Sequence, residues 1–133
     1  MPAQLKSIAV LIDADNASAK NIGLILQEIA KLGHITCKKI YGDWGNAHIQ
    51  SWQEALLTYA IDPMQHFAYV KGKNATVIGM VIEAMDLLYS DIHDGFCLIS
   101  SNSDFTSLAL RIRKNHVKVF GFGKHNTVSA FSQ

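Results

Sequence analysis

The sequence predicts a three-layer α/β/α sandwich around a mostly parallel five-stranded sheet. Strand-like and helix-like segments alternate strictly along the chain, and two of the strand-like segments are continuously apolar, as strands buried on both faces are. Strict alternation joins parallel strands by right-handed crossovers and leaves helices on both faces of the sheet. With 133 residues, 49% of them hydrophobic, the chain is expected to form a single domain over residues 1–133.

The first part of the chain supplies two strands and one helix. Residues 7–12 are expected to form the first strand, an apolar run that stops abruptly at Asp13. Residues 19–32 are expected to form a helix, because isoleucines and leucines recur there at helical spacing and a glycine follows at the stop. A second strand is expected over residues 34–41.

The middle of the chain continues the same alternation. After a turn at residues 42–46, apolar residues between positions 49 and 59 line one face of a second helix, which Asp62-Pro63 closes. Residues 64–70 are strand-like, and a long third helix is expected over residues 75–89.

The last part of the chain adds two strands and a fourth helix. A turn at Asp94-Gly95 precedes a second fully apolar strand over residues 96–100, which ends in a polar segment. A helix over residues 105–114 then leads to a fifth strand over residues 117–120. Five parallel strands and four helices are therefore expected.

Polar side chains follow the two most apolar strands, at the point where each strand ends. In open parallel sheets, ligands bind outside the carboxyl ends of the strands, where the strand order reverses. Clustered carboxylates repel one another unless a cation is present, and hard oxygen ligands without regularly spaced His or Cys favour Mg²⁺ or Mn²⁺ over Zn²⁺. Such an ion activates water for attack on a phosphodiester, which is the chemistry of metal-dependent nucleases. The first strand delivers Asp13, Asp15 and Asn16, and the fourth delivers Ser100, Ser101, Asn102, Ser103 and Asp104.

The same residues have an ordinary structural interpretation. Asp and Asn are common turn residues and helix caps after strands, and Asp104 immediately precedes the helix expected from residue 105. Either cluster alone favours this structural interpretation. The presence of both, at the ends of the two most apolar strands, favours a functional site.

Five motifs, in order along the chain, resemble the NYN domain, specifically the LabA-like branch of the PIN-like nuclease fold. They cover residues 8–16 (IAVLIDADN), 41–44 (YGDW), 72–76 (GKNAT), 84–88 (AMDLL) and 100–105 (SSNSDF), and the likeness extends from residue 8 to about residue 123. The resemblance implies a PIN-like α/β/α sandwich, a divalent-metal site and ribonuclease activity on RNA.

The resemblance also implies roles for individual residues. Asp13 is implied as the first metal-ligating carboxylate, with Asp15 and Asn16 as its companions in the loop. Asp104 is implied as the second metal ligand, and Ser101 belongs to the same cluster.

Three positions depart from the family pattern, and two of them lack a carboxylate. Similar proteins usually carry acids at the positions of Val77 and Asn102, and an aspartate at that of Glu83. Neither a valine nor a neutral amide attracts a dication as a carboxylate does. Glu83 lies six residues beyond Val77, about 9 Å along a helix, and projects about 120° away, so we do not expect it to compensate. Metal binding is therefore expected to be weak, and catalysis slow or absent.

These departures leave two main interpretations. One is a Mg²⁺- or Mn²⁺-dependent ribonuclease in which Asp13 and Asp104 hold the metal. The other is a catalytically degenerate member of the fold, acting as an RNA-binding, protein-interaction or regulatory module. A homodimeric module is a third interpretation, for which the sequence offers no direct sign.

RNA is the expected partner, through local contacts rather than bulk charge. The net charge of +1 and the 17% content of charged residues exclude a polybasic tail. Lys73 could frame a groove for the RNA backbone and Trp44 could stack a base, with Asn74, Ser101 and Asn102 completing the expected set. A solvated basic loop, with Asn74 as a helix cap, explains the same residues without a ligand.

The chain is expected to be cytoplasmic. Cys37 and Cys97, the two cysteines, both lie in apolar stretches, which suits buried thiols in a reducing compartment better than a disulfide framework. The apolar run at residues 8–12 is too short for a signal peptide or a membrane span. No membrane partner is therefore expected.

Overall fold

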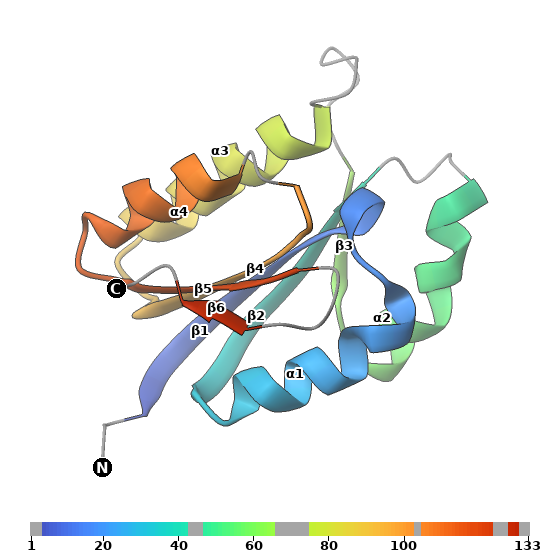
Figure 1. The fold of residues 1–133 in the computed structure, drawn as a ribbon, viewed down its shortest axis with the longest axis horizontal. Coiled ribbons are helices and arrows are strands. Elements are labelled where there is room, and N and C mark those ends of the chain that lie inside the picture. Colours follow the sequence, from blue (N-terminus) through green and yellow to red (C-terminus); the bar gives the residue numbers. More distant parts are fainter. Residues whose placement is uncertain (1–3, 43–46, 66–74, 103–104, 124–127, 131–133) are drawn as a thin grey trace.

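The computed structural model describes residues 4–42, 47–65, 75–102, 105–123 and 128–130, and these residues form one six-stranded sheet (Figure 1). The strand order is β3-β2-β1-β4-β5-β6, in which β1 to β5 run parallel and β6 pairs antiparallel with β5. The predicted fold class is confirmed, with one strand more than expected. The strands are β1 (Leu5–Asp13), β2 (Gly33–Gly42), β3 (Asp62–Gln65), β4 (Gly95–Ile99), β5 (Lys118–Phe122) and β6 (Val128–Ala130).

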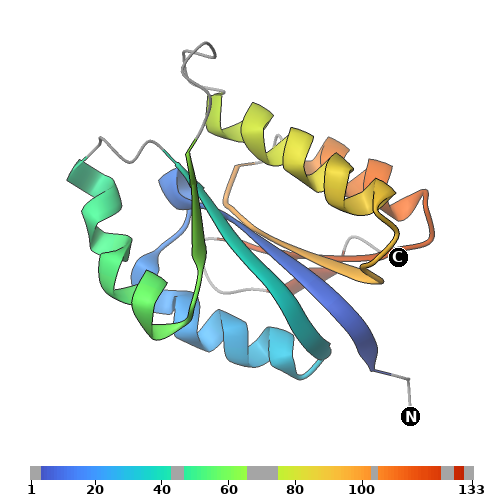
Figure 2. The ribbon, with the colours of Figure 1, turned by 180° about the vertical axis from the view of Figure 1, so that it is seen from behind.

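Helices cover both faces of this sheet, which gives the three predicted layers (Figures 1 and 2). One face carries α1 (Ile22–Ala30) and α2 (Gln53–Thr58), and the other carries α3 (Ala75–Tyr89) and α4 (Phe105–Arg113). Three short 3₁₀ helices complete the first layer: η1 (Ala14–Asn16), η2 (Ala19–Asn21) and η3 (Ala47–Trp52).

β1 lies between β2 and β4 and supplies residues to both halves of the core. Ile8, Val10 and Ile12 pack in the cluster under α1 and α2, whereas Ala9 and Leu11 pack in the cluster under α3 and α4. All five side chains are fully buried, which explains why the strand is apolar at every position. Each buried isoleucine or leucine stabilises the fold by roughly 1.5–3 kcal/mol.

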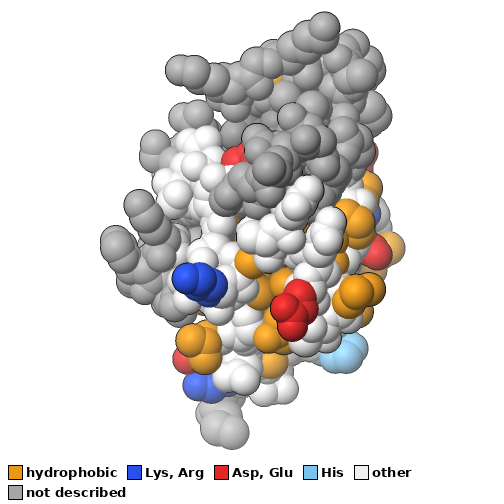
Figure 3. All heavy atoms as spheres, turned by 90° about the vertical axis from the view of Figure 1, so that its right-hand side faces the viewer, with side chains coloured by type: hydrophobic (Ala, Val, Ile, Leu, Met, Phe, Trp, Pro, Cys, Tyr) orange, Lys and Arg blue, Asp and Glu red, His pale blue; other side chains and the backbone are white. Residues whose placement is uncertain are grey.

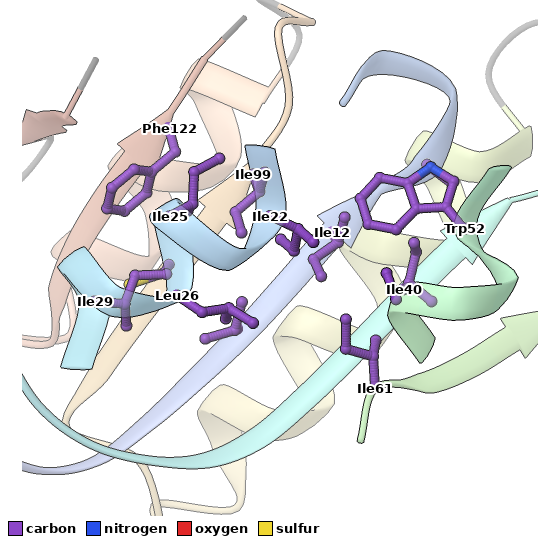
Figure 4. Packing of buried hydrophobic residues seen from close by; sticks show 14 of the residues in the cluster. Ile12, Ile22, Ile25, Leu26, Ile29, Ile40, Trp52, Ile61, Ile99 and Phe122 are labelled. Atoms are coloured by element: carbon purple, nitrogen blue, oxygen red, sulfur yellow. The ribbon is translucent and has the colours of Figure 1, made fainter. Parts of the chain in front are cut away.

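The α1 layer is held by an apolar stripe on that helix. Figure 4 shows Ile22, Ile25 and Ile29 pointing from α1 onto the sheet, and Trp52 lying over Ile40. The stripe repeats at the spacing that predicts the helix, although regular α-helix occupies only residues 22–30 of the expected 19–32. Residues 19–21 form η2 instead, and β2 begins directly at residue 33.

The second predicted helix is also divided. Residues 47–52 form η3 and residues 53–58 form α2, so the α-helical part is shorter than the apolar stripe between positions 49 and 59 suggests. Trp52 and Ala55 are buried, as a core-facing position requires.

The predicted start of the third strand is wrong. The pair Asp62-Pro63 reads as a break, but both residues belong to β3, where Ile40 is the register partner of Pro63. A proline, which has no N–H to donate, is tolerated here because β3 is the edge strand. Residues 66–70 of the expected strand lie outside the described part of the chain.

The C-terminal strands also differ from the expectation. β5 extends to Phe122, whose side chain is buried, whereas the apolar pattern suggested a strand over residues 117–120. β6 has three residues, too few for a recognisable alternation of apolar and polar positions. Its antiparallel pairing covers the edge that β5 would otherwise expose.

Candidate functional site

The strand order places a topological switch point between β1 and β4. β1 pairs with β2 on one side and with β4 on the other, so consecutive crossovers leave in opposite directions. Asp13 is the last residue of β1, and Ser100 directly follows β4. The two polar strand ends predicted to meet are therefore adjacent, at the edge where ligands bind in sheets of this kind.

Asp13 is the only buried charged residue in the described part of the chain, with 0% of its surface exposed. Its carboxylate accepts three hydrogen bonds. Oδ1 accepts from the backbone N–H of Asp15 at 3.2 Å, and Oδ2 accepts from Asn16 Nδ2 at 3.0 Å and from Ser100 Oγ at 2.8 Å. Among the described residues, no cationic side chain forms an ion pair with it.

Burial raises the pKa of Asp13 above the ordinary value for an aspartate. Hydrogen bonds from Asn16 and Ser100 oppose this shift, and the negative charge of Asp15 adds to it. The pKa of Asp13 is raised overall, so the effect of desolvation is larger than that of the three hydrogen-bond donors. A carboxylate in this condition would be stabilised by a bound cation.

Backbone hydrogen bonds hold the two polar segments against each other. The N–H of Ser101 donates to the carbonyl of Asn16 at 2.9 Å, which ties the segment after β4 to η1. Ser100 Oγ accepts from the N–H of Asn102 at 3.0 Å while its own hydroxyl donates to Asp13. The hydrogen bond from Asn102 thus helps to orient the Ser100 hydroxyl toward the Asp13 carboxylate.

Ser100 belongs to the polar cluster that the sequence places at the end of the fourth strand, but the sequence predicts no role for it there. The register of β1 with β4 indicates its contact with Asp13. Ile12 pairs with Ile99, so the next residues, Asp13 and Ser100, lie side by side on the same face of the sheet. That register cannot be read from the chain before the neighbouring strands are known.

The structure brings some predicted site residues together and does not describe others. Asp15 and Asn16 lie in η1 and are exposed, Ser101 is exposed and Asn102 is half-buried. Asp13 also acts as the N-cap of η1, as the structural interpretation of this aspartate requires. Four predicted residues lie outside the described residues and remain predictions: Trp44, Lys73, Asn74 and Asp104.

Glu83, the acid that follows Val77 in α3, has a partner on the neighbouring sheet. Its carboxylate forms an ion pair with Lys39 of β2, and both side chains are 22% exposed. The hydroxyl of Tyr41 is buried and has no hydrogen-bond partner among the described residues. Burial raises the pKa of Tyr41, and the negative charges of Glu83 and Cys37 raise it further. Tyr41 is also the register partner of Asp13 in the pairing of β1 with β2.

The oxygen atoms at Asp13 and its neighbours are of the chemical type that binds a hard cation. They are carboxylate, hydroxyl and amide oxygens, which Mg²⁺ and Mn²⁺ prefer, and the Asn16 amide can present either its nitrogen or its oxygen to the site. In the described residues, however, no three His, Cys, Asp or Glu side chains are grouped so that they could hold a metal ion. The described residues therefore supply one buried anion, Asp13, and not the full ligand set of a tightly bound metal.

Fold and site together define a doubly wound α/β protein with an oxygen-rich acidic site at its switch point. A sequence profile of the NYN domain matches residues 7–133, and the chain belongs to this family, which is a PIN-like nuclease family. The narrower LabA-like assignment remains a prediction.

Solved structures confirm the fold at low sequence identity. A protein of unknown function from Vibrio parahaemolyticus is 17% identical and superposes with a TM-score of 0.66, over 92% of this chain and 84% of that one. UDP-GlcNAc 2-epimerase from Neisseria meningitidis is 16% identical, with a TM-score of 0.51 over 88% of this chain. This chain spans only 32% of the epimerase. No curated protein has a matching sequence.

No helix in the described ranges combines the length and the apolar character needed to cross a bilayer.

Both cysteines are free thiols, and burial raises the pKa of Cys97 to about 12. A thiol with such a pKa is almost wholly protonated at neutral pH and is therefore inert.

Proposed function

We propose that this NYN domain is a divalent-metal-dependent ribonuclease of low activity, with its site at Asp13. The observation that supports this most directly is the hydrogen bond from Ser100 to Asp13, which joins two strand ends at the switch point around a desolvated carboxylate. A doubly wound sheet binds its ligands at this position, and the family is a nuclease family.

Asp13 would hold Mg²⁺ or Mn²⁺, with Asp104 as a second ligand. A bound ion of this kind lowers the pKa of a coordinated water and neutralises charge on the phosphodiester. Ser100 and Asn16 keep the Asp13 carboxylate in place through their hydrogen bonds to Oδ2. Lys73, Asn74 and Trp44, together with Ser101 and Asn102, would bind the RNA.

Low activity follows from the shortage of negative charge. Val77 lies in the first turn of α3 and Asn102 follows β4, and both positions carry neutral side chains. With a single buried carboxylate among the described residues, the affinity for a dication is expected to be weak.

The test is cleavage of single-stranded and structured RNA in Mn²⁺, in chelator, and by an Asp13→Asn variant in Mn²⁺. Chelator and Asp13→Asn should each abolish cleavage. The matched control is Asp91→Asn, because Asp91 is exposed and has a φ of 60°, a conformation that asparagine adopts readily. Equal cleavage in all samples would overturn the proposal.

A degenerate RNA-binding module is the second candidate, and the hydrogen bonding of Asp13 favours it. Both carboxylate oxygens already accept hydrogen bonds from within the chain, as in a purely structural cap. In that case the double variant Val77→Asp with Asn102→Asp should gain Mn²⁺ binding and cleavage that the natural chain lacks. Equal cleavage by the natural chain and the double variant would contradict it.

A further inference from the structure

A hollow of about 730 Å³ lies beside η1, on the α1 and α2 side of the sheet. Its walls are residues 17–20, which lead from η1 into η2, and residues of α2 and its flanks between positions 51 and 59. Figure 3 shows the side of the molecule on which α2 lies, where hydrophobic side chains are exposed among polar ones and a few separate charges. The volume is in the range of roughly 300–1,000 Å³ that holds small ligands.

The lining combines one aromatic ring with small and hydroxyl-bearing side chains. Tyr59 is half-buried, Ala55 is buried, and Ser18 and Thr58 are exposed at the surface. A flat apolar surface beside neutral hydrogen-bonding groups suits a planar, polar ring.

Gly23 of α1 makes room for the tyrosine. A Cβ added at Gly23 would lie 2.3 Å from Tyr59 Oη, so any larger residue would displace the phenol. The Tyr59 ring therefore reaches from the end of α2 to α1 and lines the hollow on its way. The glycine gives this ring a defined position.

Two opposite charges lie on opposite walls of the hollow. Lys20 comes from η2 and Glu54 from α2, and both are exposed. Among the described residues neither forms an ion pair. A cation can bind a phosphate, and a carboxylate can accept a hydrogen bond from a base amino group or a ribose 2′-hydroxyl.

The hollow is continuous with the candidate site along the chain. Ala17, which lines it, directly follows Asn16, whose side chain donates to Asp13 and whose carbonyl accepts from Ser101.

We propose that this hollow is a nucleotide subsite for single-stranded RNA. The base stacks on Tyr59, Lys20 binds the adjoining phosphate, and Glu54 accepts from the base or the ribose. The inference rests on the proposed function in taking RNA as the ligand, but it requires no metal and no cleavage.

The test is the affinity for a fluorescent single-stranded oligoribonucleotide, measured by anisotropy with chelator present so that nothing is cleaved. Tyr59→Leu should weaken binding about 5- to 100-fold, the usual effect of losing one stacked base. Tyr59→Phe should retain most of the affinity, because the ring remains. Thr58→Trp adds bulk at an exposed position without disturbing the core, and it should also weaken binding.

The charge variant in the hollow, Lys20→Ala, has two matched controls: Glu28→Gln in α1 and Lys31→Ala directly after it. Lys20→Ala should weaken binding and reduce its dependence on salt. Lys31→Ala and Glu28→Gln alter an exposed pair away from the hollow and should leave affinity unchanged. Thermal melts of every variant separate lost binding from lost folding.

Two outcomes would overturn the subsite: no binding of the oligonucleotide by the natural chain, or unchanged affinity in both Tyr59→Leu and Thr58→Trp. Unchanged affinity in these variants, with metal-dependent cleavage intact, overturns the subsite and leaves the ribonuclease standing. Lost affinity in them, with no cleavage by the natural chain in Mn²⁺, supports the subsite and overturns the ribonuclease.

Discussion

Ser100 Oγ donates a hydrogen bond of 2.8 Å to Asp13 Oδ2, although 87 residues separate the two positions in the sequence. The contact joins β1 and β4 at the point where the strand order reverses. Asn102 in turn donates its N–H to Ser100 Oγ, so the hydroxyl has a fixed direction. A buried carboxylate and the segment after β4 are therefore linked through a single side chain.

Replacing Ser100 by alanine should destabilise the fold more at pH 7 than at pH 4. At pH 7 the variant leaves a charged, buried Asp13 with one donor fewer, which costs about 1–3 kcal/mol. The Ser100 hydrogen bond lowers the pKa of Asp13, so its removal raises that pKa further and favours the neutral form at pH 4. Urea unfolding at both pH values measures the difference.

The control for Ser100→Ala is Ser90→Ala. Ser90 Oγ donates to the carbonyl of Leu87 in an exposed turn, so its loss should cost little and should not depend on pH. Equal, pH-independent losses in the two variants would show that the Ser100 hydroxyl does not act on the Asp13 charge.

Two glycines should respond to alanine in opposite directions. At Gly33 a new Cβ would lie 2.2 Å from the backbone carbonyl oxygen of Leu5, so β1 and β2 would have to separate locally. We expect a loss of more than about 3 kcal/mol, comparable with severe overpacking. At Gly79, in α3, no atom of the described residues lies within 4 Å of an added Cβ, and alanine should stabilise the helix by roughly 0.5–1 kcal/mol. Chemical denaturation of both variants tests the contrast.

Much of the fold could be predicted because its signals are local. The run before Asp13 is apolar at every position since β1 is covered on both faces, and an abrupt polar stop marks where such a strand ends. The α1 stripe likewise follows from helical spacing alone. Pro63 led to a wrong strand boundary because a proline is compatible with a strand that lies at the edge of a sheet, and the edge position of β3 is known only from the folded structure.

The candidate site could be predicted only in outline. The sequence indicates that Asp13 ends a buried strand, but the full burial of its carboxylate depends on how η1 and the segment after β4 close over it. The role of Ser100 depends on the register of β1 with β4. The hollow beside Tyr59 is formed by two separate segments whose approach no sequence pattern indicates.

Glu83→Gln should weaken the fold without affecting metal-dependent chemistry. Glu83 holds Lys39, and the loss of a partly buried pair costs roughly 1–2 kcal/mol. The hydrogen bond that Lys39 donates to Glu83 raises the pKa of Lys39 above 10.5. The pair's stabilisation should therefore be fully present at neutral pH and disappear only as pH rises through that raised pKa.

Unfolding of the natural chain and Glu83→Gln from pH 6 to pH 11 measures this pH dependence. The Mn²⁺ dependence of cleavage and the Mn²⁺ affinity of the variant should equal those of the natural chain. A reduced Mn²⁺ affinity in Glu83→Gln would place this residue in the metal site and contradict its assignment to Lys39 alone.

Asp13→Asn should remove a pH dependence of stability that the natural chain has. The folded-state pKa of Asp13 is raised above its ordinary value of 3.8, so its contribution to stability is fully present below that pH and is lost as pH rises through the folded pKa. The natural chain should thus lose stability relative to Asp13→Asn as pH rises from about 3.8, and the difference should level off above the folded pKa. Added Mn²⁺ at pH 7 should stabilise the natural chain, because it binds the charged carboxylate, and should not stabilise the variant. Urea unfolding across this pH range, with and without Mn²⁺, measures both effects. A stability difference that is constant with pH would mean that Asp13 is not desolvated, and equal stabilisation by Mn²⁺ would mean that the metal binds elsewhere.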